Sequence, residues 1–393
     1  MTGVALDGVI RDRVAGTMLG LACGDALGAG YEFGPAIGYP QEVSMRGGGP
    51  FGWAPGEWTD DTAMAVCIAQ AAADHGGLDT EAALDAVVER WCDWAAHSRD
   101  VGAQTRAVLN AASDRPTAAR ASQVAAELHA RTGKTAGNGS LMRTAPVALA
   151  FLDDESALWE AAQRVSALTH FDPEAGEACA LWCLAIRHAI FTGTYEGLEA
   201  ALDRLAPARR DVWAQRLAES ATSQPWQFPN NGWVVHALQA AWSAVITTPD
   251  QAFVPELHLF PAHTAAVAIE RAVRAGNDTD TVAAIAGSLV GARWGMSALP
   301  LRWTTAVHGF HEVRNGATAI MRANALQHLS YQVAEHKSGP LPASFQPLGS
   351  AASALATISG VDGLLLGGHA DMAEADLQDV GVISLSRLSL IHI

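Results

Sequence analysis

The sequence predicts an all-α fold. Apolar residues recur at helical spacing through most of the chain, and almost no alternating strand pattern precedes residue 355. Apolar residues also make up 49% of the 393 positions, which is enough for a sizeable core. No repeat of fixed period is present, so the length corresponds to one large helical domain or to two ordinary ones.

The first predicted helix covers residues 8–29, and four glycines recur along it, at positions 16, 20, 24 and 28. Small residues at this spacing form one stripe and let another backbone approach closely. Charged residues in the same segment, among them Arg11 and Asp25, indicate a buried helix of a water-soluble protein. No strand precedes the helix and the GxGxxG spacing is absent, which excludes a dinucleotide-binding fingerprint.

Glu32 follows this first helix in a segment that its flanking glycines allow to bend. A single Glu in a loop is usually solvated, so this one matters only if the loop folds over a functional site. Residues 34–57 are rich in Gly and Pro and predict a long irregular loop, a kind of segment that often serves as a lid.

Further apolar periodicity predicts helices over residues 62–74, 80–97, 105–112, 155–168, 173–192, 196–206, 209–221, 233–247, 262–275 and 282 to about 294. Residues 336–354 are poor in charge and indicate a linker. The first strand-like runs come after it, at 363–368 and 380–385, and predict a short, incomplete α/β-like tail. The predicted organisation is therefore a catalytic domain at 1–335, a linker at 336–354 and a tail at 355–393.

Two acidic junctions stand immediately before helices. Thr59-Asp60-Asp61-Thr62 precedes one apolar helical run, and Asp278-Thr279-Asp280-Thr281 precedes another. The simpler interpretation of each is helix capping, which needs one side-chain oxygen. Each junction offers several oxygens, and two such clusters together favour a magnesium-type site. A calcium-binding EF-hand is excluded, because Ala283 and Leu289 stand where that loop requires Gly and Glu.

Three smaller features are ambiguous when taken alone. The run Gly137-Asn138-Gly139-Ser140 precedes a predicted helix and leaves backbone N–H groups open to a phosphate, although an ordinary tight turn would have the same composition. His170 stands in a loop between helices, where a packed or solvated histidine is the commoner case. Asp100 is placed to cap the helix that follows it.

Charge and composition exclude several classes of function. The net charge of −16 disfavours nucleic acid and anionic membrane surfaces as partners. The longest uncharged apolar run, at 233–246, is too short and too polar to cross a bilayer. No signal-peptide pattern opens the chain, and the cysteines form no CxxC pair, so we expect a cytoplasmic protein whose thiols are reduced.

These motifs together resemble the ADP-ribosylglycohydrolase family over roughly residues 9–310. The resemblance rests on seven segments that occur in the family's order: Gly24-Asp25-Ala26-Leu27-Gly28 with Glu32, Thr59-Asp60-Asp61-Thr62, Asp100-Val101-Gly102, Gly137-Asn138-Gly139-Ser140 with Met142 and Arg143, Thr169-His170, Asn231-Gly232-Trp233, and Asp278-Thr279-Asp280-Thr281. The family's usual Gly before the last segment is Asn277 here, which a turn conformation tolerates.

The resemblance implies an orthogonal multi-helix bundle with two Mg²⁺ ions in a central cleft, where Mn²⁺ can substitute. It implies hydrolysis of the glycosidic bond to ADP-ribose in an ADP-ribosylated protein or small molecule, with an arginine-type linkage favoured, ADP-ribose as product and the protein acting as a monomer. The metal ligands so implied are Thr59, Asp60, Asp61, Asp278, Asp280 and Thr281.

By the same resemblance, Glu32 gates the site or handles the proton of the leaving group, and Asp60 and Asp61 complete the catalytic set. Cleavage should pass through an oxocarbenium-like state. The resemblance also implies that the distal ribose lies near Asp100 and Gly102, and that the diphosphate and adenosine lie near Gly137, Asn138, Gly139, Ser140 and His170.

Two alternatives remain at this level. One is a homologue that binds ADP-ribose or serves a structural role without turnover, against which the complete acidic set and Glu32 argue. The other is phosphoester hydrolysis, which a two-metal site also supports. The ADP-ribose motifs disfavour this second alternative.

Overall fold

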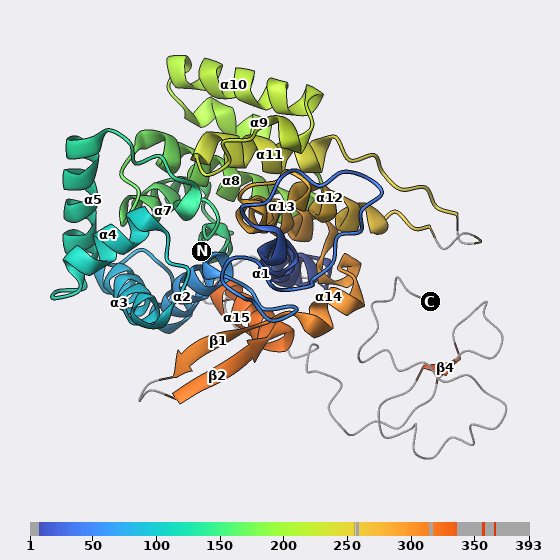
Figure 1. Ribbon diagram of the computed structural model, residues 1–393, viewed down its shortest axis with the longest axis horizontal. Helices are drawn as coiled ribbons and strands as arrows, with labels where there is room; N and C mark the ends of the chain where they lie inside the picture. The colour runs from blue at the N-terminus through green and yellow to red at the C-terminus, as the bar shows by residue number, and fades with distance from the viewer. Residues whose placement is uncertain are drawn as a thin grey trace. The chain divides into compact units, whose positions relative to one another are not determined.

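The computed structural model describes residues 8–254, 256, 259–313, 317–335, 356–357 and 365–366. Contacts within the chain divide it into two units, Met1–Gly339 and Pro340–Ile393. The first unit is built almost wholly of helices (Figure 1), which confirms the predicted all-α fold.

The described α-helices follow most of the predicted segments closely. They are α1 (Gly8–Gly28), α2 (Asp60–His75), α3 (Glu81–His97), α4 (Ala103–Ala112), α5 (Ala118–Thr132), α6 (Ala145–Ala150), α7 (Glu155–Ala167), α8 (Pro173–Thr192), α9 (Gly197–Ala200), α10 (Pro207–Thr222), α11 (Val234–Ile246), α12 (His263–Val273), α13 (Thr279–Trp294), α14 (Leu301–Ala306) and α15 (Ala323–Glu335). The segment predicted as one helix at 196–206 is instead α9 followed by the 3₁₀ helix Ala201–Arg204.

The glycine stripe of α1 forms the centre of the unit. A Cβ at Gly16, Gly20 or Gly24 would overlap the backbone of α13, and a Cβ at Gly28 would lie 2.5 Å from the Cα of Asp280. The two helices therefore run side by side in backbone contact (Figure 1). This packing brings the first turn of α13 against the last turn of α1, and with it the second acidic junction.

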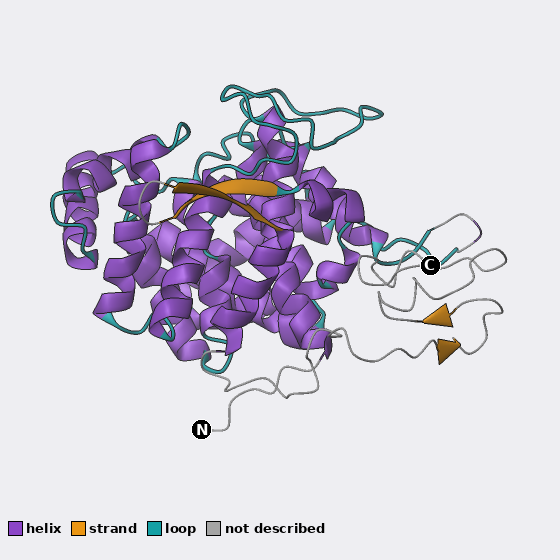
Figure 2. Ribbon diagram, turned by 90° about the horizontal axis from the view of Figure 1, so that it is seen from below, coloured by secondary structure: helices purple, strands orange, loops and turns teal. Residues whose placement is uncertain are grey.

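A β-hairpin contradicts the expectation that no strand precedes residue 355. Strands β1 (His308–Val313) and β2 (Ala317–Arg322) pair antiparallel, with Phe310 opposite Ile320 (Figure 2). Phe310 and Ile320 are 52% and 53% exposed. A half-buried strand usually alternates apolar inward residues with polar outward ones. This pattern is absent here, because the outward residues Phe310 and Ile320 are apolar and the inward Gly309 has no side chain.

The predicted loop at 34–57 lacks regular helix or strand in the structure, and Arg274 holds its first part. The guanidinium of Arg274 donates to the carbonyl oxygens of Ile37, Gly38 and Gln41. These bonds attach the loop to the end of α12. The first part of the loop therefore lies close to the second acidic junction, where Ala36 packs against Gly276.

Within the second unit, the structure describes the strands β3 (Ala356–Thr357) and β4 (Leu365–Leu366), which pair antiparallel. Strand β4 falls inside the predicted run at 363–368. The predicted linker at 336–354 and the run at 380–385 lie outside the residues described.

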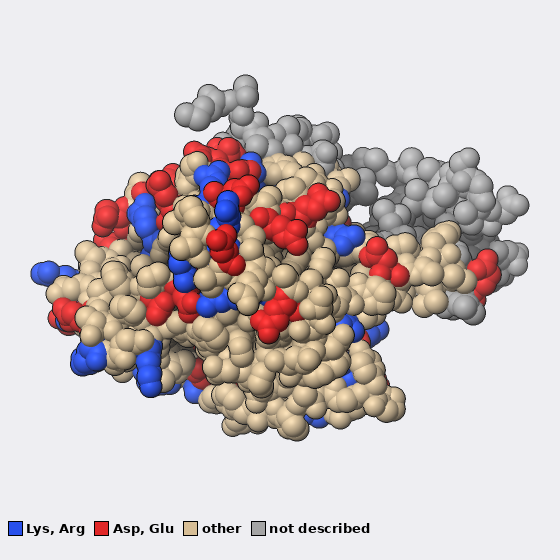
Figure 3. All heavy atoms as spheres, turned by 90° about the horizontal axis from the view of Figure 1, so that it is seen from above, with Lys and Arg blue, Asp and Glu red and all other residues tan. Residues whose placement is uncertain are grey.

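The distribution of surface charge and the state of the cysteines agree with the expectations from charge and cysteine spacing. On the face seen in Figure 3, Asp and Glu side chains lie among Lys and Arg side chains, rather than leaving a separate basic area. All five cysteines are free, and four of them are buried, while Cys92 is partly exposed. A search of the described helices finds none with the length and apolarity needed to span a membrane.

Candidate active site

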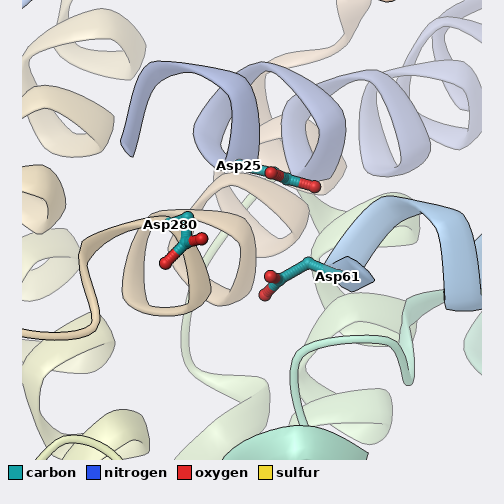
Figure 4. Close-up of side chains that lie close together, drawn as sticks. All are labelled: Asp25, Asp61 and Asp280. Carbon is teal, nitrogen blue, oxygen red and sulfur yellow. The ribbon is translucent and has the colours of Figure 1, made fainter. Parts of the chain in front are cut away.

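Three helices bring carboxylates to one place. Carboxylate oxygens of Asp25 from α1, Asp61 from α2 and Asp280 from α13 lie within 4.8 Å of one another (Figure 4). Glu32, Asp278 and Asp280 form a second group of the same kind. Asp280 belongs to both groups, so the two acidic junctions of the sequence meet at the end of α1.

The first turn of α2 is capped by other segments of the chain. Asp25 Oδ1 accepts from Thr59 N at 2.9 Å, and its Oδ2 accepts from Thr62 N and from Thr62 Oγ1. Asp60 N donates to Asp100 Oδ2 at 2.8 Å. The capping interpretation of this junction is therefore wrong, since the side chains of Asp60 and Asp61 are not used for it.

Asp100 was expected to cap the helix that follows it, and that expectation is also wrong. The N-cap position of α4 is Gly102, and no side-chain cap is formed there. Asp100 instead accepts from Ser98 Oγ and from the backbone of α2. It thereby ties the end of α3 to the acidic cluster.

Asp61 carries an unsatisfied oxygen. Thr59 Oγ1 donates to Asp61 Oδ2 at 2.9 Å, while Asp61 Oδ1 is buried and has no hydrogen-bond partner among the described residues. A buried carboxylate oxygen without a partner is costly unless a cation accompanies it. This orphan oxygen, in a set of hard oxygen donors, fits a cation of the magnesium type.

Burial is the main electrostatic influence on the cluster. It raises the pKa of Asp60, Asp61 and Asp280 well above the usual range, and neighbouring carboxylates raise each pKa further. Burial likewise raises the pKa of Asp25 to about 6, against the lowering effect of its hydrogen bonds. Without a cation these side chains would repel one another when ionised, and a bound cation would remove that repulsion.

Asp278 is positioned by two asparagines. Asn138 Nδ2 donates to Asp278 Oδ2 at 2.7 Å and also to the carbonyl of Asn231. Asn231 Oδ1 accepts from Asp278 N, and Asn231 Nδ2 donates to the carbonyl of Gly276. The glycine-rich run therefore supports the second acidic junction directly, through Asn138. None of these four hydrogen bonds was predicted from the sequence.

At the same junction, Thr281 N donates to Asp280 Oδ1 at 3.0 Å. Thr281 Oγ1 lies 3.7 Å from Met142 Sδ. The carboxylate of Asp280 is therefore oriented by the backbone of its own helix.

Glu32 is half-buried and lies beside the cluster. The backbone around it is fixed, because Phe33 N donates to Asn277 O and Asn277 N donates to Gly34 O, at 2.6 and 2.7 Å. Asn277 adopts a positive φ of 57°, a conformation that Asn tolerates better than most residues, as the sequence indicated. Burial, followed by the charges of Asp278, Asp100 and Asp25, raises the pKa of Glu32 to about 8. Its carboxyl group therefore holds a proton near neutral pH.

The glycine-rich run lies against His170. A Cβ at Gly139 would stand 3.1 Å from His170 Cε1, and a Cβ at Gly137 would stand 3.3 Å from His170 Nε2. Ser140 is buried and its hydroxyl accepts from Ser166 Oγ, so only its backbone is available to a ligand. Gly102 has open space where a side chain would be.

Arg143 and Thr169 orient the imidazole of His170. Arg143 Nη2 donates to Thr169 Oγ1 at 2.6 Å, and Thr169 Oγ1 lies 2.7 Å from His170 Nδ1. A guanidinium can only donate, so Thr169 Oγ1 accepts from Arg143 and its own proton is free to bond His170 Nδ1. Nδ1 is then the acceptor of the ring, and the ring proton is on Nε2, beside the glycines. Burial lowers the pKa of His170 well below its usual range, so the ring is neutral.

Sequence reasoning missed Asp25, Asn231, Arg143 and Thr169 as individual site residues, although it noted the segments that contain them. Asp25 carried a usable signal, because it is an acidic residue within the glycine stripe of a buried helix. Arg143 is buried over the ring of Trp91, and no pattern of the sequence indicates that environment.

A family model described as ADP-ribosylglycohydrolase matches residues 7–332. The chain belongs to the ADP-ribosylglycohydrolase family. This membership confirms the resemblance seen in the sequence and makes the chain a glycosidase-type hydrolase. The ADP-ribosylglycohydrolase fold accounts for the helical architecture around the acidic cluster.

Individual relatives extend the comparison. The chain is 33% identical over 315 residues to a protein named ADP-ribosylarginine hydrolase Tri1 from Pseudomonas putida (strain GB-1), covering 75% of this chain and 74% of the relative. It is 29% identical over 303 residues to the ADP-ribosyl-[dinitrogen reductase] glycohydrolase of Rhodospirillum rubrum, covering 75% and 90%. A solved structure titled ADP-ribosylglycohydrolase-related protein complex matches with a TM-score of 0.59 at 29% identity. The match covers 84% of this chain and 99% of that chain.

Proposed function

We propose that this ADP-ribosylglycohydrolase hydrolyses the bond between ADP-ribose and the guanidinium of an arginine residue, in a reaction that requires Mg²⁺. The observation that carries the proposal is the meeting of carboxylates from α1, α2 and α13 beside Glu32. The arginine linkage is supported by the relative named ADP-ribosylarginine hydrolase. An inactive binding homologue is not supported.

The residues present fit a divalent cation. Asp61, Asp278 and Asp280 belong to the two carboxylate groups, and Asp25 lies with Asp61 and Asp280. Together with Thr59, Asp60 and Thr281, which adjoin them in sequence, Asp61, Asp278 and Asp280 would hold two Mg²⁺ ions. Carboxylate and hydroxyl oxygens suit Mg²⁺, and Mn²⁺ can replace it. When bound, the ions would orient ribose hydroxyls and lower the pKa of a water molecule.

The side chains of this chain supply the remaining chemistry. Glu32, whose pKa is raised to about 8 by burial and by neighbouring carboxylates, would give a proton to the leaving guanidine nitrogen. The water that adds to the anomeric carbon loses a proton, which restores the acid form of Glu32. Asp60 and Asp61 favour the positive charge that develops on the ribose as the bond breaks.

The ADP-ribose part of the substrate would lie along the glycine-rich run. Backbone N–H groups of Gly137, Asn138, Gly139 and Ser140 would bind the diphosphate together with the Nε2–H of His170. Asp100 and Gly102 would border the distal ribose, next to the start of α2.

Linkage specificity is the experiment that tests this proposal. The protein with Mg²⁺ should release free ADP-ribose from an ADP-ribosyl-arginine peptide much faster than from an ADP-ribosyl-serine peptide. The release is measured by chromatography of the nucleotide products. Faster cleavage of the serine linkage would contradict the proposed substrate.

Cation binding should stabilise the fold. A concentration of Mg²⁺ about a hundredfold above its Kd should raise Tm by about 5 °C for a domain of this size. The folded-state pKa of Glu32 is raised to about 8 from its ordinary value of 4.5, so the stability of the metal-free protein falls as pH rises toward that value. Added Mg²⁺ should therefore stabilise more at pH 8 than at pH 6, as measured by differential scanning fluorimetry.

The control for this experiment is Asp61→Asn, which keeps an acceptor for Thr59 Oγ1 and removes the charge. Metal-free Asp61→Asn protein should melt above metal-free wild type, and its Tm should change little with Mg²⁺. An equal Mg²⁺ shift in both proteins would place the cation elsewhere.

Gly139→Val should prevent ADP-ribose binding. The added side chain would be forced against His170, because even a Cβ stands 3.1 Å from that ring. Isothermal titration calorimetry in Mg²⁺ should show at least a ~10-fold higher Kd, the effect of about 1.4 kcal/mol. Gly38→Val is the matched control, since a Cβ there meets nothing within 4 Å. Equal binding by both variants would put the diphosphate away from the glycine-rich run.

A catalytic domain at 1–335 is proposed to act without the tail. The family model ends at residue 332, and all residues of the acidic cluster precede it. A chain that ends at Gly339 should fold and keep kcat/KM within a few-fold of the full-length value, measured on the same ADP-ribosylated substrate. A large loss of activity would show that residues after 339 complete the site.

A further inference from the structure

A cavity of about 540 Å³ lies between the start of α2, the end of α3 and the β1–β2 hairpin. The loop that precedes α2 contributes Trp53, α3 contributes Asp93 and Trp94, and the hairpin contributes Phe310. The proposed mechanism uses none of these four residues. The cavity therefore needs a separate explanation.

The cavity reaches the acidic cluster. Thr59 and Asp100 are part of its lining, and both contact the acidic junction at the start of α2. Thr59 Oγ1 donates to Asp61, and Asp100 accepts from the backbone of Asp60.

The lining, which consists of described residues, includes neither the glycine-rich run nor His170. The diphosphate and adenosine are proposed to lie with that run. The cavity therefore opens on the other side of the glycosidic bond, where the acceptor must be.

The walls suit a polypeptide better than a free anion. The two arginines of the lining are already paired, Arg99 with Glu57 at 2.8 Å and Arg90 with Asp74 at 2.5 Å. Asp93 adds an exposed carboxylate, which favours a cationic ligand. Aromatic faces from Trp94 and Phe310 bind aliphatic chains and cations.

Trp53 adds a donor without an acceptor. Its indole is buried, and the guanidinium carbon of Arg99 lies over it, 4.1 Å from the centre of the ring. Its Nε1–H is buried and has no hydrogen-bond partner among the described residues. A buried donor of this kind favours a ligand that brings a carbonyl oxygen, such as a peptide group.

We propose that this cavity binds the polypeptide segment that carries the ADP-ribosylated arginine. The methylene chain of the arginine lies along Trp94 and Phe310, and its guanidinium reaches the bond beside Thr59 and Asp100. A backbone carbonyl of the segment accepts from Trp53. This assignment rests on the proposed function, and it makes the enzyme selective for arginine within a protein over a free ADP-ribosylated guanidine.

The test compares two substrates in Mg²⁺: an ADP-ribosyl-arginine peptide and ADP-ribosyl-guanidine, which has the same linkage without the methylene chain or the backbone. Phe310→Ala should raise KM for the peptide ~10-fold, as for an aromatic anchor worth more than 1 kcal/mol. It should leave the KM of the guanidine substrate within about 2-fold and the Kd of ADP-ribose unchanged. Trp53→Phe should also affect the peptide alone, because it removes the N–H and keeps the ring.

Phe253→Ala is the matched control, because Phe253 is 70% exposed and lies between α11 and α12, outside the cavity lining. It should change neither substrate. Wild-type kinetics of Phe310→Ala and Trp53→Phe on the peptide would overturn the proposal, as would an equal loss on both substrates. If wild-type protein cleaves neither substrate, the proposed function itself is wrong, and the acceptor assignment is wrong with it.

Discussion

Asp280→Asn should abolish turnover while leaving the helical fold intact. Asp280 belongs to both carboxylate groups, and it is buried at the first turn of α13. Asparagine keeps the acceptor that Thr281 N uses and removes only the charge. Loss of residues that merely orient metal ligands costs about 10–100-fold, so loss of a shared ligand should lower kcat/KM by more than ~100-fold.

The comparison for Asp280→Asn is Asp211→Asn, in which the replaced side chain is 76% exposed on α10. Circular dichroism should be the same for both variants and the wild type. Only Asp280→Asn should lose both activity and the rise in Tm with Mg²⁺. Near-normal activity of Asp280→Asn would exclude this carboxylate from the cation site.

Glu32→Gln should lower kcat by more than ~10²-fold, the low end of the range for lost acid–base catalysis. Its raised pKa of about 8 means that the wild-type carboxyl group has a proton to donate near neutral pH, whereas the amide has none of comparable acidity. Calorimetry should show that the variant still binds ADP-ribose in Mg²⁺, because Gln keeps the size of the side chain.

Glu42→Gln provides the matched comparison for Glu32→Gln, since Glu42 is an exposed residue of the same loop region. That variant should have wild-type kcat. If Glu32→Gln also turns over normally, Glu32 is a loop residue without a part in proton transfer, and the acid must come from elsewhere in the cluster.

Sequence pattern predicted the elements that depend on local spacing. The glycines of α1 indicated a close backbone approach, and α13 provides it. The acidic residues at the starts of α2 and α13 indicated oxygen donors, and Asp61, Asp278 and Asp280 do come together. In each case the prediction depends only on where a residue stands within one helix: on its spacing along α1, or at the start of α2 or α13.

Features that depend on contacts between distant segments were not predictable in this way. Asp25 caps α2 from another helix, and Asn138 orients Asp278 across 140 positions of sequence. Local rules assign a cap to the nearest polar residue, which is why the capping interpretation of Thr59 and Asp100 was wrong. The hairpin was not predicted because one of its inward positions is Gly309, and glycine has a low strand propensity. A larger residue does not fit there, since a Cβ would overlap the indole of Trp58.

The most direct test of the proposed reaction is the release of ADP-ribose from an ADP-ribosyl-arginine peptide by protein treated exhaustively with EDTA and then dialysed. The release should be absent in the metal-free protein and should return when Mg²⁺ or Mn²⁺ is added, in proportion to the fraction of sites filled. Undiminished release by the chelated protein would contradict the assignment of the α1–α2–α13 carboxylate cluster as a catalytic metal site.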